Sequence, residues 1–293
     1  MTIIRKLKRK NAENLFREAR KISTSKKLKF SYTNVISKKC LIDPVCKHCE
    51  WISDNYFNEN SSEITPLEKF LDFSDKAERI GVDRIVVPSG WQGYNIPDYF
   101  YDYLQELLDV TEIDVWGAFG AVGEKVLEKL SDIGLSGYSC GLETTNEEVF
   151  SEVRPGDDMK ARIETLRYAK EIDLKTSSSL VLGMGEKVED RADTIRLMRD
   201  LRIDSAGVWP FCPSPYTEME KWEHPNSYVF AKTLATLVTE LEDTDIVGDT
   251  RPKNLKWSIR AGSNVFSIRD RDSIERIEQM RKNLIEKDSS RAN

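Results

Sequence analysis

The sequence of 293 residues contains no long hydrophobic run. A membrane-spanning helix needs roughly 18 or more consecutive apolar residues, so we expect no membrane span. The N-terminal stretch MTIIRKLKRKNAENLFREAR is basic, and it has no apolar core of the kind that secretory signal peptides contain. Its apolar residues lie among charged ones, which predicts an amphipathic helix packed on the rest of the fold.

An excess of positive charge is also missing. The chain has 44 Lys and Arg against 50 Asp and Glu, for a formal net charge of −6. This balance argues against extensive binding to the backbone of a nucleic acid. The hydrophobic share of 39% and the charged share of 32% are typical of a globular protein. Neither a nucleic acid nor a membrane is therefore an expected partner.

Cysteine is scarce, and its count of five is odd. A secreted disulfide scaffold normally has a denser, even set of cysteines, so we expect a reducing compartment and a cytoplasmic protein. No Gly-rich or Ser-rich linker divides the chain, and no low-complexity tract is present. We expect a helical extension over residues 1–29 and one barrel domain over residues 30–293.

Short β-rich segments alternate with helical patterns along the whole chain. Strands are expected at 30–36, 83–88, 113–119, 136–142, 175–182, 205–211, 244–249 and 262–268. Helices are expected near 65–80, 97–109, 121–134, 157–172, 187–201, 226–242 and 271–287, and an irregular connection at 250–260. Thr65 is the expected N-cap before Pro66. Eight alternations predict a (β/α)8 barrel, with a doubly wound sheet as the alternative.

Three of the five cysteines are crowded into the stretch KKCLIDPVCKHCEW. Cys40, Cys46 and Cys49 follow the first expected strand with the spacing C-x5-C-x2-C. In a (β/α)8 barrel this places them at the C-terminal rim, where such barrels carry their chemistry. Closely spaced thiolates bind zinc or an iron–sulfur cluster, and the motif alone leaves both open. His48 lies between two of the cysteines, which makes joint coordination of one zinc ion awkward.

The cysteine loop after a first barrel strand resembles that of the radical S-adenosylmethionine (SAM) superfamily, in which C-x3-C-x2-C is usual. His48 fits the aromatic or His position before the last cysteine. The central block from GLETTNEEVF to DTIRLM and the segment IRAGSNVFSI resemble biotin synthase, the HydE maturase and methylornithine synthase. The longer C-x5-C spacing is similar to that of the HmdB (HcgA) family of methanogens, which is linked to the guanylylpyridinol (FeGP) cofactor of [Fe]-hydrogenase.

The resemblance implies a [4Fe–4S] cluster on Cys40, Cys46 and Cys49, with SAM bound to its open iron and cleaved to a 5′-deoxyadenosyl radical. It implies that Glu143 meets the SAM ribose and that Arg162 pairs with the SAM carboxylate, with Arg154 as the rival. Each could also be an ordinary structural residue of a helix entry or surface.

Two further segments match SAM-binding motifs only in part. The PSGW stretch stands where relatives have Gly-Gly-Glu, so Ser89 and Gly90 could bind the SAM amino group through their backbone, although the acid is missing. In the GMGE stretch, Gly183 and Gly185 would let the backbone approach the adenine. Glycines are also common in strand-to-helix turns, so this second match is weak.

Substrate candidates are side chains expected at the barrel mouth or lumen. They are Trp91, Ser177, Ser179, Trp209 and Tyr216. The serines could equally be interior filler, and Trp91 could simply pack. Cys140 and Cys212 have no CxxC partner, and we expect both to be inert buried thiols.

The resemblance implies an enzyme that acts on a small-molecule substrate with electrons from a donor such as ferredoxin or flavodoxin. Within the same class, the alternative is an enzyme similar to methylornithine synthase or biotin synthase that acts on another metabolite. The alternative from a different class is a zinc-stabilised, non-catalytic binding barrel.

Overall fold

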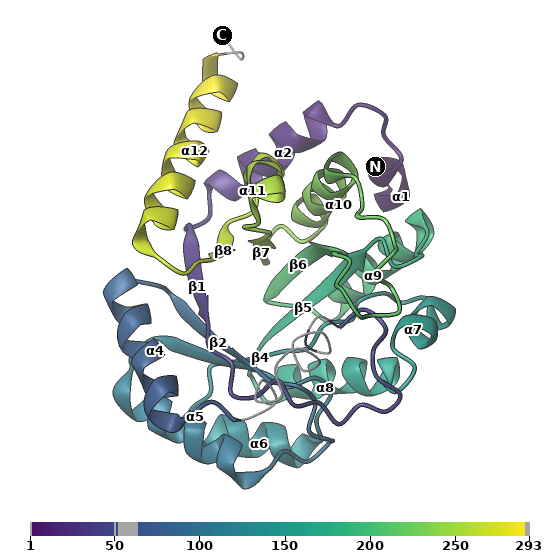
Figure 1. Ribbon diagram of the computed structural model, residues 1–293. Coiled ribbons are helices and arrows are strands. Elements are labelled where there is room, and N and C mark those ends of the chain that lie inside the picture. Colours follow the sequence, from purple (N-terminus) through teal and green to yellow (C-terminus); the bar gives the residue numbers. More distant parts are fainter. Residues whose placement is uncertain (1, 50, 52–63, 291–293) are drawn as a thin grey trace.

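The β-rich segments form parallel strands that close into a barrel in chain order, as predicted (Figure 1). This arrangement is seen in a computed structural model that describes residues 2–49, 51 and 64–290. The strands are β1 (Lys29–Thr33), β2 (Arg84–Pro88), β3 (Asp114–Ala118), β4 (Gly137–Ser139), β5 (Lys175–Leu182), β6 (Ser205–Pro210), β7 (Asp245–Gly248) and β8 (Val265–Ser267).

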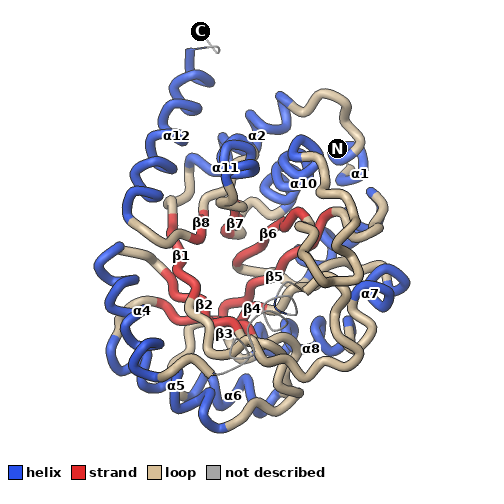
Figure 2. The backbone as a smooth tube through the Cα atoms, viewed as in Figure 1, coloured by secondary structure: helices blue, strands red, loops and turns tan. Residues whose placement is uncertain are grey.

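Helices surround the strand ring on its outside (Figure 2). They are α4 (Leu67–Ile80), α5 (Asp98–Val110), α6 (Glu124–Asp132), α7 (Glu147–Val153), α8 (Met159–Glu171), α9 (Val188–Asp200), α10 (Ser227–Glu240), α11 (Pro252–Arg260) and α12 (Arg271–Ser290). None of the helices in the described part of the chain combines the length and apolarity that a membrane crossing needs.

Strand β5 shows how the sequence places side chains on the two faces of the barrel wall. Thr176, Ser178, Leu180 and Leu182 are buried, whereas the residues between them are half-buried or exposed. Successive side chains of a strand point to opposite faces. Leu180 and Leu182 belong to the hydrophobic core beneath the helices, and Ser177 and Ser179 of the alternate set line the lumen.

The N-terminal segment forms two helices, α1 (Ile3–Leu7) and α2 (Glu13–Thr24), rather than one. Both pack on α10. Lys6 pairs with Glu240 at 2.8 Å, and the ring of Phe16 meets Tyr228 edge-on and lies beside Trp257 of α11. The amphipathic pattern is thus explained by packing, because Phe16 is fully buried.

Three local predictions were wrong. Residues 252–260 form α11 and are not irregular, because Pro252 at its first position starts a helix whose Leu255 and Ile259 are buried one turn apart. Thr65 is not the N-cap of α4, since Pro66 holds that position and the Thr65 hydroxyl donates to the Val35 carbonyl. Helix α7 (Glu147–Val153) was not predicted.

Strand β4 is shorter than the predicted 136–142. It ends at Ser139, and the chain then bends at Glu143, whose φ of 61° lies in the left-handed region. The bend costs backbone energy for a residue other than glycine. It is held by a parallel bridge from Glu143 to Leu180 of β5 and directs the Glu143 carboxylate into the barrel mouth.

Candidate active site

The loop that carries the three clustered cysteines follows β1 and is fixed by backbone hydrogen bonds on two sides. The Leu41 amide donates to the Trp91 carbonyl at 2.7 Å, and the Lys47 amide donates to the Val153 carbonyl at 2.9 Å. The first bond comes from the segment after β2 and the second from the end of α7. The position of the cysteines therefore depends on parts of the chain that lie far away in sequence.

Two glycines let these neighbouring segments approach the loop closely. A Cβ on Gly90 would lie 2.1 Å from the Lys39 carbonyl oxygen, and a Cβ on Gly156 would lie 2.3 Å from that of Pro44. Side chains do not tolerate such distances. Gly90 thus has a packing reason to be glycine, beside the SAM-binding role that the sequence predicts for its backbone.

We expect Gly90→Ala to displace the cysteine loop. The added methyl group meets backbone atoms that cannot rotate away, so the fold should lose about 1–3 kcal/mol and iron uptake on anaerobic reconstitution should fall severalfold. Iron content per chain and thermal unfolding measure the two effects. Gly207→Ala is the matched control, since its Cβ would meet nothing closer than 3.5 Å. Full iron uptake by Gly90→Ala would refute this account of the loop.

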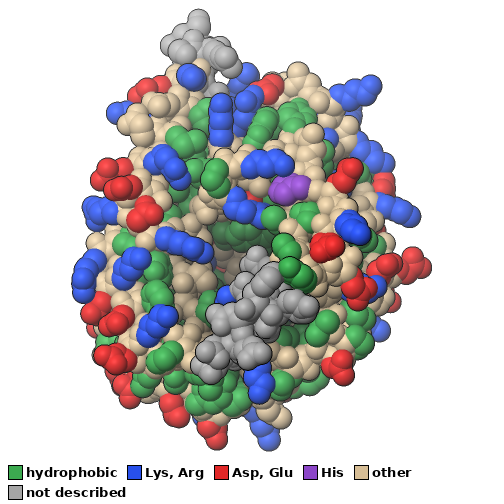
Figure 3. All heavy atoms as spheres, viewed as in Figure 1, with side chains coloured by type: hydrophobic (Ala, Val, Ile, Leu, Met, Phe, Trp, Pro, Cys, Tyr) green, Lys and Arg blue, Asp and Glu red, His purple; other side chains and the backbone are tan. Residues whose placement is uncertain are grey.

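One cavity of about 260 Å³ joins the cysteine loop to the C-terminal ends of β2, β3 and β4, and we name it the cysteine cavity. It is lined by Cys40, Ile42, Cys46, His48, Cys49, Trp51, Ser89, Gly90, Trp91, Ala118, Gly120, Ser139, Cys140, Gly141, Glu143, Arg154, Arg162 and Ser179. This face of the molecule is hollowed at its centre (Figure 3). The three clustered cysteines thus share one space with Glu143 and Arg162.

The three thiols of the loop differ in exposure. Cys40 is exposed, Cys49 is half-buried and Cys46 is buried, which raises the pKa of the Cys46 thiol to about 11. Burial, together with the nearby Arg154, lowers the pKa of His48 to about 4, so its ring is neutral near pH 7.

The clustered donors of this loop are thiols, which are the ligands of iron–sulfur clusters. Among residues 2–49, 51 and 64–290, no three His, Cys, Asp or Glu side chains gather tightly enough to hold one metal ion. Thiolates of a four-iron cluster bind different irons and stand farther apart than the ligands of one zinc ion. The three thiols of the loop line one cavity, so they can serve one cluster.

A buried network of charges forms part of the wall of the cysteine cavity. The Arg162 guanidinium donates to the Asp157 carboxylate at 2.7 and 3.0 Å and to the Gly141 carbonyl at 2.6 Å. Arg154 donates to the same carboxylate at 2.8 Å and to Glu143 Oε1 at 3.2 Å. Burial alone would raise the pKa of Asp157, but the two guanidinium groups outweigh it and hold that pKa at about 2.

The structure brings some of the predicted SAM-binding residues together and leaves others apart. Ser89, Gly90, Glu143 and Arg162 line the cysteine cavity. Gly183 and Gly185 do not, although both have φ near 100°. The turn that holds these two glycines is stabilised from within, because the Glu186 carboxylate accepts the Gly183 and Met184 amides.

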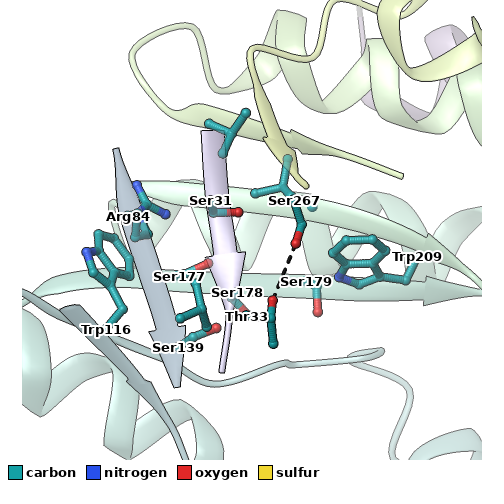
Figure 4. Close-up of a pocket in the computed structure, with 14 residues that line it drawn as sticks. Ser31, Thr33, Arg84, Trp116, Ser139, Ser177, Ser178, Ser179, Trp209 and Ser267 are labelled. Atoms are coloured by element: carbon teal, nitrogen blue, oxygen red, sulfur yellow. Dashed lines mark hydrogen bonds between the residues drawn. The ribbon is translucent and has the colours of Figure 1, made fainter. Parts of the chain in front are cut away.

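A second cavity, of about 190 Å³, occupies the interior of the barrel, and we name it the lumen cavity (Figure 4). It is lined by Ser31, Thr33, Arg84, Val86, Trp116, Ser139, Ser177, Ser178, Ser179, Gly207, Trp209, Val247, Val265 and Ser267. Ser139 and Ser179 line both cavities. The cysteine cavity and the lumen cavity therefore adjoin at these two serines.

The predicted substrate residues divide between the two cavities. Ser177, Ser179 and Trp209 line the lumen cavity, whereas Trp91 lines only the cysteine cavity and donates from Nε1 to the Ala121 carbonyl at 2.8 Å. Tyr216 lines neither cavity and is 51% exposed. Its place in a loop beyond β6, whose path the local sequence does not fix, explains the difference.

The two remaining cysteines were predicted to be buried, and this is correct for only one of them. Cys140 is buried, which raises its pKa to about 11, and Cys212 is exposed. Sequence reasoning also missed Asp157 and Arg84. Arg84 had a signal, since it is a charged residue on the lumen-facing parity of the apolar segment RIVVP.

Comparison with known proteins identifies the family. Residues 34–198 match the model of the radical SAM superfamily. The chain belongs to this superfamily. It is a radical SAM enzyme, and the family uses a [4Fe–4S] cluster and SAM. The zinc-stabilised, non-catalytic alternative is set aside. Members act on small-molecule or peptide substrates and need an electron donor.

Individual relatives are distant. The chain is 25% identical over 80% of its length to the [FeFe] hydrogenase maturase subunit HydE of Thermotoga maritima, spanning 67% of that protein. It is 24% identical over 77% of its length to biotin synthase of Clostridium acetobutylicum, spanning 70% of that protein. It spans only 56% of an uncharacterized protein of Methanocaldococcus jannaschii, at 26% identity.

Solved structures share the fold. Methylornithine synthase (PylB) superposes with a TM-score of 0.85 at 18% identity, over 95% of this chain and 91% of that one. The [FeFe]-hydrogenase maturase HydG superposes with a TM-score of 0.78 at 18% identity, over 89% of this chain and 63% of that one. At such identities the likeness concerns the fold alone.

Proposed function

We propose that Cys40, Cys46 and Cys49 hold the [4Fe–4S] cluster and that SAM lies between them and the Glu143 side of the cysteine cavity. The observation that carries this proposal is the shared lining of one cavity by the three thiols, Glu143 and Arg162. When bound, the reduced cluster and SAM supply a carbon radical at C5′ that removes a hydrogen atom from substrate. This chain's own residues bind, orient and shield the reactants.

The cavity wall offers a partner for each end of SAM. The second oxygen of the Glu143 carboxylate can accept from ribose hydroxyls, while its Oε1 is oriented by Arg154. A guanidinium suits the SAM carboxylate, and Arg154 and Arg162 both line the cavity. Both guanidinium groups already bind Asp157, so Arg162 remains our candidate for this role and Arg154 its rival. Ser89 and Gly90 remain our candidates for the SAM amino group, and Gly183 and Gly185 for the adenine.

The adjoining lumen cavity supports a substrate position next to SAM. A molecule held there would meet the cysteine cavity at Ser139 and Ser179, so a hydrogen atom could be removed without exposure to solvent. We propose a small-molecule substrate, with a low-potential one-electron donor such as reduced ferredoxin or flavodoxin.

We further propose that the enzyme acts in biosynthesis of the guanylylpyridinol cofactor of [Fe]-hydrogenase, as an HmdB-type protein. The C-x5-C-x2-C spacing supports this assignment. A second candidate is an enzyme similar to methylornithine synthase or biotin synthase acting on another small metabolite. The 24% identity to a biotin synthase over 77% of the chain favours it.

The test is product analysis under anaerobic conditions. With SAM and a strong reductant, the reconstituted protein should slowly release 5′-deoxyadenosine and methionine, and the true substrate should accelerate both. Substrates deuterated on carbon should transfer label into 5′-deoxyadenosine. A pyridinol product would support the HmdB assignment, while methylornithine or biotin would support the second candidate. If S-adenosylhomocysteine were the only nucleoside product, the proposed chemistry would be wrong.

A further inference from the structure

Many inward-facing residues of the barrel are small and polar, although two tryptophans and three valines also line the lumen cavity. Barrels of this type usually fill their interior with layers of Val, Ile and Leu. Here Ser31, Ser177 and Gly207 occupy inward positions of three different strands, and a cavity of about 190 Å³ remains. That volume is below the ~300 Å³ at the small end of drug-sized pockets, so its natural occupant is a small metabolite.

Among the described residues, the only charged side chain that lines this cavity is Arg84. It lies at the start of β2, in register with Ser31, and it is 8% exposed. Its guanidinium stacks on the Trp116 ring at 3.8 Å, donates to Ser205 Oγ at 3.4 Å and lies 3.9 Å from Asp245. Figure 4 shows it at the end of the lumen away from the C-terminal ends of the strands.

The four carboxylates beneath Arg84 form their short ion pairs with lysines and not with Arg84. Asp83 pairs with Lys27 at 2.5 Å, Asp245 with Lys29 at 2.7 Å, Asp204 with Lys170 at 2.7 Å and Asp114 with Lys175 at 3.2 Å. Each of these bonds is shorter than any ion pair of Arg84. The four carboxylates raise the pKa of Arg84, but burial outweighs them and lowers it, as expected for a cation whose lost hydration is not fully replaced.

Hydroxyl groups on the same wall are unused by the protein. Within the described ranges, the side chains of Ser31, Ser139, Ser177 and Ser179 make no hydrogen bond, although all four line the lumen cavity. Thr33 and Ser267 bond each other at 3.3 Å. Interior serines that only filled space would be expected to bond neighbouring groups. Four unpaired hydroxyls favour a ligand that itself carries several hydroxyl groups.

We propose that the lumen cavity binds a small polyhydroxylated anion, with its carboxylate or phosphate group on Arg84 and its hydroxyls on Ser31 and Ser177. The other end of the ligand then lies at Ser139 and Ser179, beside the cysteine cavity. This assignment rests on the proposed function, in which the ligand of the lumen cavity is the substrate. It adds the chemical class of that substrate.

The experiment measures binding to the anaerobically reconstituted protein with SAM bound and the cluster oxidised, so that no turnover occurs. The probes are matched sets: glycerol, glycerate and glycerol 3-phosphate, then ribose, ribonate and ribose 5-phosphate. Calorimetry should give at least roughly tenfold tighter binding for one anion class than for the neutral polyol of the same set. The carboxylate and phosphate arms show which anion is preferred.

Arg84→Gln should abolish this preference, while Arg84→Lys should retain part of it. The lysine variant keeps the charge, so it separates loss of the site from loss of the fold. Lys175→Gln is the matched control, because it removes a charge beneath the lumen from a residue that is 56% exposed and does not line the cavity. Ser177→Ala should weaken the binding of the anion and of the neutral polyol to the same extent.

Equal affinity for anions and neutral polyols would overturn the proposal, as would no binding of any probe or an unchanged preference in Arg84→Gln. SAM binding and 5′-deoxyadenosine release by the same preparations report on the proposed function separately. If both were normal while the anions failed to bind, only the inference about the lumen would fall.

Discussion

Replacing Cys46 by Ala should remove the iron–sulfur cluster and all SAM cleavage. Wild-type protein reconstituted without oxygen should hold about four irons per chain, and Cys46→Ala should hold close to none, because the remaining two thiols cannot retain the cluster. No 5′-deoxyadenosine should form with SAM and reductant. Iron analysis, visible absorption and product chromatography measure these outcomes.

The cluster-free fold should survive this change. Cys46 lies in a loop at the rim and not among the barrel strands, so Ala should cost only about 1 kcal/mol, or a few degrees in thermal midpoint. Cys212→Ser is the matched control, since Cys212 is exposed and does not line the cysteine cavity. It should keep its iron and its activity. Four irons in Cys46→Ala, or none in Cys212→Ser, would contradict the assignment of ligands.

Arg162→Ala should destabilise the fold strongly. Arg162 and Asp157 are each 5% exposed, and removing one partner of a buried ion pair typically costs 3–5 kcal/mol. Because Arg154 still holds Asp157, we expect the lower end, about 3 kcal/mol, and a thermal midpoint lower by roughly 6–12 °C. Arg167→Ala on the same helix is the control, since its pair with Glu164 is half-exposed and worth less than about 1 kcal/mol.

This effect should depend on pH in a defined direction. The pKa of Asp157 is lowered from 3.8 to about 2 in the folded state, so its stabilisation is present above pH 3.8 and is lost as the pH falls toward 2. The gap in stability between wild type and Arg162→Ala should be constant at neutral pH and should narrow in this acid range. Chemical denaturation at several pH values measures it.

Glu143→Gln should leave the stability of the fold unchanged and should weaken SAM binding. The substitution keeps the size and the acceptor for Arg154, so the fold should remain stable, while the lost charge weakens the proposed bonds to the SAM ribose. A charge-assisted hydrogen bond is worth about 1.5–3 kcal/mol, or roughly ten- to hundredfold in SAM affinity. A variant of Arg162 that was stable but bound SAM poorly would make Arg162 a SAM anchor and not a structural residue.

Much of the architecture could be predicted because it follows from local patterns. Alternation of strand and helix periods gave eight strands within a few residues of their observed bounds, and parity placed Ser177 and Ser179 on the lumen side. The sequence pattern missed two short helices. Helices α7 and α11 have seven and nine residues, too few for a helical period to stand out from neighbouring loops.

The cysteine motif and the family resemblance also came from the sequence alone, because thiols at short spacing must lie near one another in any fold. Which charged groups bind each other was decided only by tertiary structure. Arg162 forms its ion pair with Asp157, whereas Arg154 donates to Glu143. The spacing of these residues in the sequence does not show this choice of partners. That outcome depends on the left-handed bend at Glu143, which is fixed by pairing with β5.

The contact between the two cavities was also decided only by tertiary structure. Ser139 and Ser179 are forty residues apart and belong to different strands, and they adjoin only because β4 pairs with β5 next to the cysteine loop. The lumen cavity above Arg84 likewise needs all eight strands to close. Sequence periodicity fixes which face a side chain takes, whereas the distance between faces is set by barrel closure, a property of the whole chain.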